Sequence, residues 1–361
     1  LSLLATVVFS SFAILGYSNR AKSFRLVFCF FPLLFLGIIW FGGWYRLNGV
    51  QNLTVENVLL RLVQPNIPQH DKWNPKFREK HLRNLVELSI SRANLPGQSI
   101  PTHIIWPETS IPYILDGDTN LLRGVFTASS SLTQIHKIIP DGGALLVGSL
   151  RRTIANDGGV KLWNSLHAIA SNGKIISTFD KFHLVPFGEY TPFKSYLEKL
   201  FVVGKLIKNR IDFSSGPGPM MMKIPGVPPM SPLICYEVIF SGSVTPSNKD
   251  HGVKTHWLLN VTNDAWFGLS SGPFQHLVTA QLRAVEEGLP LIRVANTGIS
   301  AAIDSYGRII VSSALNQRIY LDVKLPKELD SKTYYSKYGQ FGLLVMVVLL
   351  LAFSRQRVFA E

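Results

Sequence analysis

Three side chains, Glu108, Lys181 and Cys235, each stand at the end of a short apolar run, and together they could carry out acyl transfer. A thiolate is a nucleophile, and a neighbouring cation lowers the pKa of its thiol. A carboxylate can accept the thiol proton and later activate a second nucleophile. A lysine beside the thiol can stabilise the oxyanion of a tetrahedral intermediate. The product would be a thioester, which divides one acyl transfer into two easier steps.

Each of the three residue types also fits a role without chemistry. Glu108 alone could be a loop carboxylate and Lys181 a solvated surface lysine, while an unpaired Cys235 packs well as a small hydrophobe. The other cysteine, Cys29, lies in an apolar run of membrane-span length, so we expect no disulfide between the two. A leftover cysteine in a non-cytoplasmic domain suggests a reactive thiol.

Other catalytic patterns are missing from the sequence. It has no Gly-x-Ser-x-Gly nucleophile motif. Its nine histidines form neither an HExxH pair nor a Cys-His metal pattern. We therefore expect no metal and no other cofactor.

The part of the chain between Arg46 and Lys337 alternates short apolar runs with helical stretches, which predicts an α/β layered domain. The predicted strands are Leu59–Val63, His103–Trp106, Ala144–Gly148, Leu166–Ala170, Ile175–Phe179, Leu233–Cys235, Leu258–Val261, Leu291–Ala295 and Ala301–Asp304. The predicted helices are Pro75–Ala93, Leu121–Ile138 and Pro273–Glu287, and a hairpin turn is predicted at Asp304–Gly307. Ligands collect at the carboxyl ends of strands in α/β sheets, so the three reactive residues could share one crevice.

The composition points to lipid contact. Only 16% of the residues are charged, below the roughly 25% usual in soluble proteins. The net charge of +13 favours anionic partners. Without a nucleic-acid-binding signature, anionic lipid is favoured over nucleic acid.

Three apolar runs are candidate membrane segments. Leu1–Tyr17 is interpreted as an incomplete span, Leu26–Trp44 as a full span that Pro32 could kink, and Tyr338–Phe353 as a short one. A buried core helix is the alternative for the last run.

Basic residues flank these runs and indicate their orientation. Arg20, Lys22 and Arg25 lie between the first two runs, and Arg355 and Arg357 follow the third. Basic loops mark the cytoplasmic side, so the intervening domain is expected outside. The predicted organisation is membrane segments over 1–45, a catalytic domain over 46–337, and a membrane helix with a cytoplasmic tail over 338–361.

The stretch Phe193–Arg210 places apolar residues near helical spacing between lysines and an arginine. Such a basic amphipathic element could rest on an anionic bilayer. An ordinary surface helix explains the pattern equally well.

Several motifs resemble those of the nitrilase (carbon–nitrogen hydrolase) superfamily and, within it, the apolipoprotein N-acyltransferase family. The segments Trp106-Pro-Glu108, Lys181 with His183–Tyr190, and Ile234–Glu237 are similar to the Glu–Lys–Cys segments of the superfamily. The narrower resemblance rests on Gln64–Gln69 with Trp73, on Thr262–Gly268, on Gly272–His276, and on Arg283, Ala284, Glu286, Gly288, Pro290, Arg293, Asn296 and Gly298. It spans about Leu59 to Gly307.

The resemblance implies a four-layer αββα sandwich flanked by transmembrane helices. It implies Cys235 as nucleophile, Glu108 as general base and Lys181 as oxyanion stabiliser. It also implies that Glu189 and Glu237 support the site and that Trp73 and Tyr236 shape the substrate pocket; the Tyr236 backbone N–H could also contact the oxyanion. The implied reaction moves an acyl chain from a phospholipid to the N-terminal amine of a diacylglyceryl-cysteine on an apolipoprotein. The implied location is the bacterial inner membrane, with the catalytic domain of a monomer in the periplasm.

The sequence departs from the family pattern at two points. Pro65 stands where the family has glycine. The family also carries more spans before the catalytic domain, so we interpret the sequence as N-terminally truncated. Two other functions fit less well: an amidase or nitrilase that passes the acyl group to water, and an inactive membrane-anchored binding protein.

Overall fold

The chain divides into two units, Leu1–Asn52 and Leu53–Glu361, each of which is described by itself. The structure, a computed structural model, describes residues 2–16, 21–91, 100–111, 114–116, 135–154, 158–197, 212–246 and 254–348.

The first unit is helical. It consists of α1 (Ser2–Ser11), the short 3-10 helix η1 (Phe12–Gly16) and α2 (Lys22–Leu47). Among the described residues, α2 is the one helix that is long and apolar enough to cross a membrane. Its 26 residues extend about 39 Å, more than the roughly 30 Å of a bilayer's hydrocarbon core. The predicted span Leu26–Trp44 lies within it.

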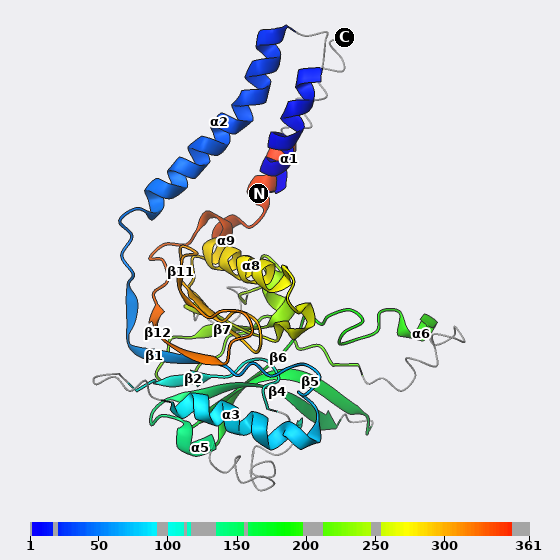
Figure 1. The fold of residues 1–361 in the computed structure, drawn as a ribbon, viewed down its shortest axis with the longest axis vertical. Helices are drawn as coiled ribbons and strands as arrows, with labels where there is room; N and C mark the ends of the chain where they lie inside the picture. Colours follow the sequence, from blue (N-terminus) through cyan, green and yellow to red (C-terminus); the bar gives the residue numbers. More distant parts are fainter. Residues whose placement is uncertain are drawn as a thin grey trace. The chain divides into compact units, whose positions relative to one another are not determined.

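The second unit is built on two sheets (Figure 1). The strands of the first sheet are β1 (Thr54–Gln64), β2 (His103–Ile105), β3 (Ile114–Asp116), β4 (Ala144–Ile154), β5 (Val160–Ala170), β6 (Ile175–Asp180) and β12 (Ile319–Pro326). The strands of the second sheet are β7 (Met230–Ile234), β8 (Trp257–Thr262), β9 (Leu291–Ala295), β10 (Ala301–Ile303) and β11 (Ile309–Ser312).

The second unit also contains helices and short 3-10 helices. They are η2 (Pro75–Phe77), α3 (Arg78–Ile90), α5 (Ile135–Ile138), α6 (Lys194–Leu197), η4 (Cys235–Ile239), η5 (Asp264–Phe267), α8 (Gly272–Glu287) and α9 (Tyr334–Tyr338). α3 and α5 lie on the outer face of the first sheet and α8 on that of the second (Figure 1). Their buried side chains pack against the strands there. A third core cluster joins the inner faces of both sheets, for example through Leu62, Leu146 and Leu259. The predicted αββα layering is therefore confirmed.

The topology brings particular strand ends together. β1, β2 and β4 are parallel, and β5 is antiparallel to both β4 and β6. The chain therefore leaves β2 and β6 at the same edge of the first sheet. In the second sheet β7, β8 and β9 are parallel, so they also end at one shared edge.

Most predicted elements are present, but several have different bounds. Strands β1, β4 and β5 are longer than their apolar runs, because polar residues such as Gln64, Arg151 and Lys161 continue the pairing. The predicted strand Leu233–Cys235 is wrong at its end: Cys235 has φ of 51°, which no strand adopts, and it opens η4 instead. The predicted hairpin turn is confirmed, since Gly307 N donates to Asp304 O between β10 and β11.

The predicted helices are partly confirmed. α8 fits its prediction and ends at Gly288 with a left-handed φ of 69°. The helix predicted from Pro75 starts as η2 and ends at Ile90. Of the helix predicted over Leu121–Ile138, only α5 lies in the described part, and of Phe193–Arg210 only α6 does. The last apolar run continues from α9 into a helix over 341–348, and the rest of it lies outside the described residues.

Candidate active site

Glu108 lies just beyond β2 and is buried between the two sheets. Its Oε1 accepts a hydrogen bond from Asn164 Nδ2 of β5 at 2.7 Å. Its Oε2 accepts one from the backbone N–H of Asn263, just after β8, at 2.8 Å. Donors from both sheets therefore fix the orientation of this carboxylate.

Lys181 follows β6 directly and is only 1% exposed. Its Nζ donates to Glu189 Oε1 at 2.8 Å and lies 3.8 Å from Glu108 Oε1. Burial by itself lowers the pKa of Lys181, but the charges of Glu108, Cys235 and Glu189 outweigh it and hold that pKa above its ordinary value. The site therefore contains a permanent ammonium group.

Cys235 follows β7, where its left-handed backbone turns the chain from the strand into η4. Burial raises the pKa of its thiol to about 12, and Glu108 adds to the rise. Lys181 and a hydrogen bond with Thr262 act in the opposite direction. Lys181 lowers the pKa of the thiol as expected, but by less than burial raises it. The resting thiol therefore keeps its proton at neutral pH. Thiol chemistry at neutral pH would therefore need a base, such as the neighbouring carboxylate of Glu108.

The structure thus brings together the three residues predicted to react, at strand ends of both sheets. The family profile described as carbon-nitrogen hydrolase matches residues 61–329, which include all three. This chain belongs to the carbon-nitrogen hydrolase family.

Curated relatives of this carbon-nitrogen hydrolase chain are named apolipoprotein N-acyltransferase. The protein of Rhodopseudomonas palustris is 37% identical over 99% of this chain and 65% of its own length. That of Allorhizobium ampelinum is 41% identical over 87% of this chain and 56% of its own length. The chain thus spans less than two thirds of these relatives. A glutamine-dependent NAD+ synthetase structure from Acinetobacter baumannii matches 76% of this chain and 48% of its own, at 18% identity and a TM-score of 0.48.

Glu189 holds the lysine of this carbon-nitrogen hydrolase site in place. Its Oε1 accepts from Lys181 Nζ and, at 3.2 Å, from Asn164 Nδ2. Its Oε2 accepts from the backbone N–H of Val185 at 2.8 Å. Because Asn164 also donates to Glu108, one amide links the two carboxylates that flank the lysine.

Glu237 ties the loop after β6 to the end of β7. Its Oε1 accepts from the backbone N–H groups of Phe182 and His183, and its Oε2 accepts from that of Ile234 at 2.7 Å. The carboxylate is fully buried, and burial raises the pKa of Glu237 to about 8 against the opposing effect of these donors. These contacts place the residues that follow Lys181 beside the residue that precedes Cys235.

We expect Glu237→Gln to destabilise this connection. An amide has one acceptor oxygen, so at least one of the three backbone N–H groups loses its partner, at a cost of about 1–3 kcal/mol. Urea unfolding in detergent should detect the loss. Glu56→Gln, a change at an exposed position of β1, is the control. A free energy of unfolding equal to that of the wild type would contradict the bridging role.

The structure shows less about the two residues expected to shape the pocket. Trp73 is 39% exposed and neighbours the buried Lys72. Tyr236 is half-buried, and its ring packs edge-on against Phe240 with centroids 5.0 Å apart. Their substrate contacts stay a prediction.

Sequence reasoning gave no role to a buried network behind Cys235. His276 Nε2 lies 3.2 Å from Cys235 O, and its Nδ1 lies 2.9 Å from Asp264 Oδ1. Asp264 Oδ2 in turn accepts from Arg293 Nη2 at 2.6 Å. All three residues fall within the motifs quoted for the family resemblance. Those motifs were the signal in the sequence that could have indicated them. Lys72 and Asn164 were also missed, since neither stands in a pattern that indicates chemistry.

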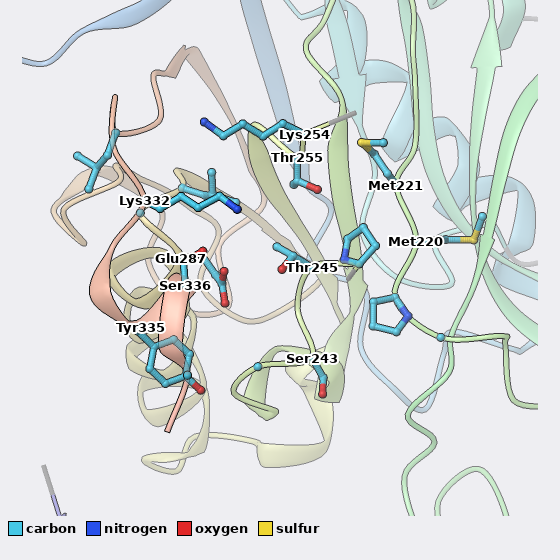
Figure 2. Close-up of a pocket in the computed structure, with 18 of the residues that line it drawn as sticks. Met220, Met221, Ser243, Thr245, Lys254, Thr255, Glu287, Lys332, Tyr335 and Ser336 are labelled. Carbon is cyan, nitrogen blue, oxygen red and sulfur yellow. The ribbon is translucent and has the colours of Figure 1, made fainter. Parts of the chain in front are cut away.

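A cavity of about 1030 Å³ lies elsewhere in the second unit (Figure 2). Its lining includes Thr255 and Leu289, which precede β8 and β9, whereas the reactive residues follow the carboxyl ends of strands. Figure 2 shows Lys254, Lys332 and Glu287 around it. None of the three reactive residues lines this cavity, so it is separate from the candidate active site.

Proposed function

We propose that the chain transfers an acyl chain from a phospholipid, through a thioester on Cys235, to the N-terminal amine of a diacylglyceryl-cysteine of an apolipoprotein. The observation that carries the proposal is the cluster of the buried Glu108 and Lys181 with the half-buried Cys235. The names of the curated relatives favour an amine as the acceptor.

The first half-reaction forms the thioester. Cys235 Sγ attacks the ester carbonyl of the phospholipid while Glu108 takes the thiol proton. Lys181 stabilises the oxyanion, and the Tyr236 backbone N–H is the second donor in our scheme. The C–O bond then breaks, and the lysophospholipid leaves as an alcohol after taking the proton from Glu108.

The second half-reaction releases the product. The acceptor amine attacks the thioester carbonyl, and Glu108 takes the proton that the amine loses. The C–S bond breaks, the new amide leaves, and the proton on Glu108 returns to the Cys235 sulfur. The two halves share one base and one oxyanion site, as a ping-pong reaction requires.

We propose further that the protein is a monomer that crosses the bacterial inner membrane several times, with this domain in the periplasm. The length and apolar character of α2 support a membrane location. The basic residues around Lys22 and Arg25 support a cytoplasmic position for the start of α2.

Glu108→Gln should lower transfer by about 10²–10⁴-fold, because an amide accepts no proton from the thiol. The amide can keep part of the hydrogen bonding to Asn164 and Asn263, so the fold should survive. Glu87→Gln, at a carboxylate that is 52% exposed, should leave transfer unchanged. A Glu108→Gln protein that retains more than a tenth of the activity would exclude Glu108 as the base.

The acceptor decides between transfer and hydrolysis, the second function that the family allows. The detergent-extracted protein is incubated with a phospholipid labelled in its acyl chain, and with a diacylglyceryl peptide whose N-terminus is either free or acetylated. We expect labelled peptide from the free amine alone. Labelled fatty acid in both samples, with no labelled peptide, would identify a hydrolase.

A further inference from the structure

A second lysine, Lys72, lies buried beside the reactive cluster. It is delivered by a turn after β1, which Asn74 N closes by donating to Asp71 O at 3.0 Å. Its Nζ donates to the backbone oxygen of Glu108 at 3.2 Å and also to Thr109 Oγ1. Lys72 therefore contacts the main chain at the proposed base, whereas Lys181 faces the carboxylate.

The turn that Lys72 contacts is tightly constrained. Thr109 has φ of 44°, a left-handed conformation that β-branched residues rarely adopt. Gly148 packs so closely against the turn that a Cβ there would lie 2.5 Å from Pro107 O and 2.7 Å from Glu108 Cα. Ser110 N donates to Gly148 O at 2.8 Å. A backbone held in this way needs contacts that fix it, and Lys72 supplies two of them.

The charge of Lys72 also acts on the reactive groups. Burial lowers the pKa of Lys72 to about 8, and the charges of Glu108 and Cys235 limit the fall. The ammonium form is therefore present below about pH 8 and is lost as the pH rises through that value. The other charged groups around Glu108 and Cys235 are Lys181, Glu189 and Asp264. Below pH 8 a second cation thus favours the ionised forms of the base and the thiol.

We propose that Lys72 is a positioning residue: its ammonium group fixes the Glu108–Thr109 turn by two hydrogen bonds and supplies a second positive charge for thiol activation. This inference rests on the proposed thiol chemistry and adds a residue to it. The role differs from that of Lys181, because the hydrogen bonds of Lys72 reach the backbone and hydroxyl of the turn.

The test is the pH profile of Cys235 alkylation by iodoacetamide, quantified on the Cys235 peptide by mass spectrometry. Lys72→Met should slow alkylation at pH 7 about tenfold or more, since a stabilising charge is removed, and its difference from the wild type should shrink above about pH 8, where Lys72 is itself neutral. Lys72→Arg should restore the wild-type rate at pH 7 because it keeps the charge. Lys76→Met, at an exposed lysine nearby, is the control.

A second variant separates charge from packing. Lys72→Gln keeps a donor for the turn but no charge, so it should fold like the wild type and still slow alkylation at pH 7 more than above about pH 8. If Lys72→Gln or a folded Lys72→Met protein keeps the wild-type profile, or loses rate equally at every pH, the proposal is wrong. Alkylation needs neither phospholipid nor acceptor. A changed pH profile without acyl transfer would therefore support the role of Lys72 and refute the proposed function. Acyl transfer with an unchanged profile would support the proposed function and refute the role of Lys72.

Discussion

Replacing Cys235 with alanine is expected to lower acyl transfer by about 10⁴-fold or more, while the protein still folds. The thiol is the acyl acceptor in the proposed reaction, and the other cysteine, Cys29, belongs to α2 in the first unit. The side chain of alanine fits where the thiol was. The measurement is transfer of a labelled acyl chain to a diacylglyceryl peptide in detergent.

The control for this experiment is Cys29→Ala, which should transfer at the wild-type rate. Circular dichroism and the unfolding midpoint of both variants show whether the fold is intact. A well-folded Cys235→Ala protein with more than a hundredth of the wild-type rate would remove Cys235 as the nucleophile.

Arg293→Met is expected to destabilise the domain by about 3–5 kcal/mol, the usual effect of removing one partner from a buried ion pair. Arg293 and Asp264 are both fully buried, 2.6 Å apart, and Arg293 also donates to Asn260 Oδ1 and to Ile299 O. Without the guanidinium group, Asp264 loses its permanent positive partner and keeps hydrogen bonds with His276 and Thr262.

The same pair predicts a pH dependence. Burial alone raises the pKa of Asp264, but Arg293 and His276 outweigh it and hold that pKa well below its ordinary range. Because an unfolded aspartate titrates near about 3.9, the stabilisation is complete above that pH and is lost as the pH falls toward the lower folded value. Arg293→Met should lack this stabilisation, so its free energy of unfolding should fall less as the pH drops below about 3.9.

Urea unfolding of the detergent-solubilised protein at pH 7 and at about pH 3, which is below the pKa of an unfolded aspartate, measures both effects. Arg318→Met is the matched control, since Arg318 and Glu87 form an ion pair in which both side chains are exposed, worth about 1 kcal/mol or less. Equal stability of Arg293→Met and the control at pH 7 would show that the buried pair does not stabilise the site.

The sequence allowed the layered α/β class and most strands to be predicted, because buried strands of both sheets are short apolar runs with clear ends. It allowed the three reactive residues to be grouped, because each follows such a run. The outer halves of β4 and β5 were missed, since Arg151 and Lys161 interrupt their apolar character while the strands still pair. The left-handed φ of Cys235 was likewise invisible to a pattern of apolar residues.

The remaining site contacts depend on distances between residues far apart in the chain. Asn263 donates to Glu108 from 155 positions away, and Glu237 accepts from Phe182 across 55. Periodicity and composition carry no information about such pairs. The balance of burial against charge at Cys235 is also set by packing. The sequence therefore indicated a cation near the thiol but not the net rise of the thiol pKa.

The most direct test of the proposed reaction is the intact mass of the detergent-extracted protein after incubation with phospholipid and no acceptor. We predict a fatty-acyl mass increment that maps to Cys235 and disappears when a diacylglyceryl peptide is added, together with the appearance of N-acylated peptide. If the folded protein shows no increment, or if the increment decays at the same rate with and without the peptide, acyl transfer through Cys235 is contradicted.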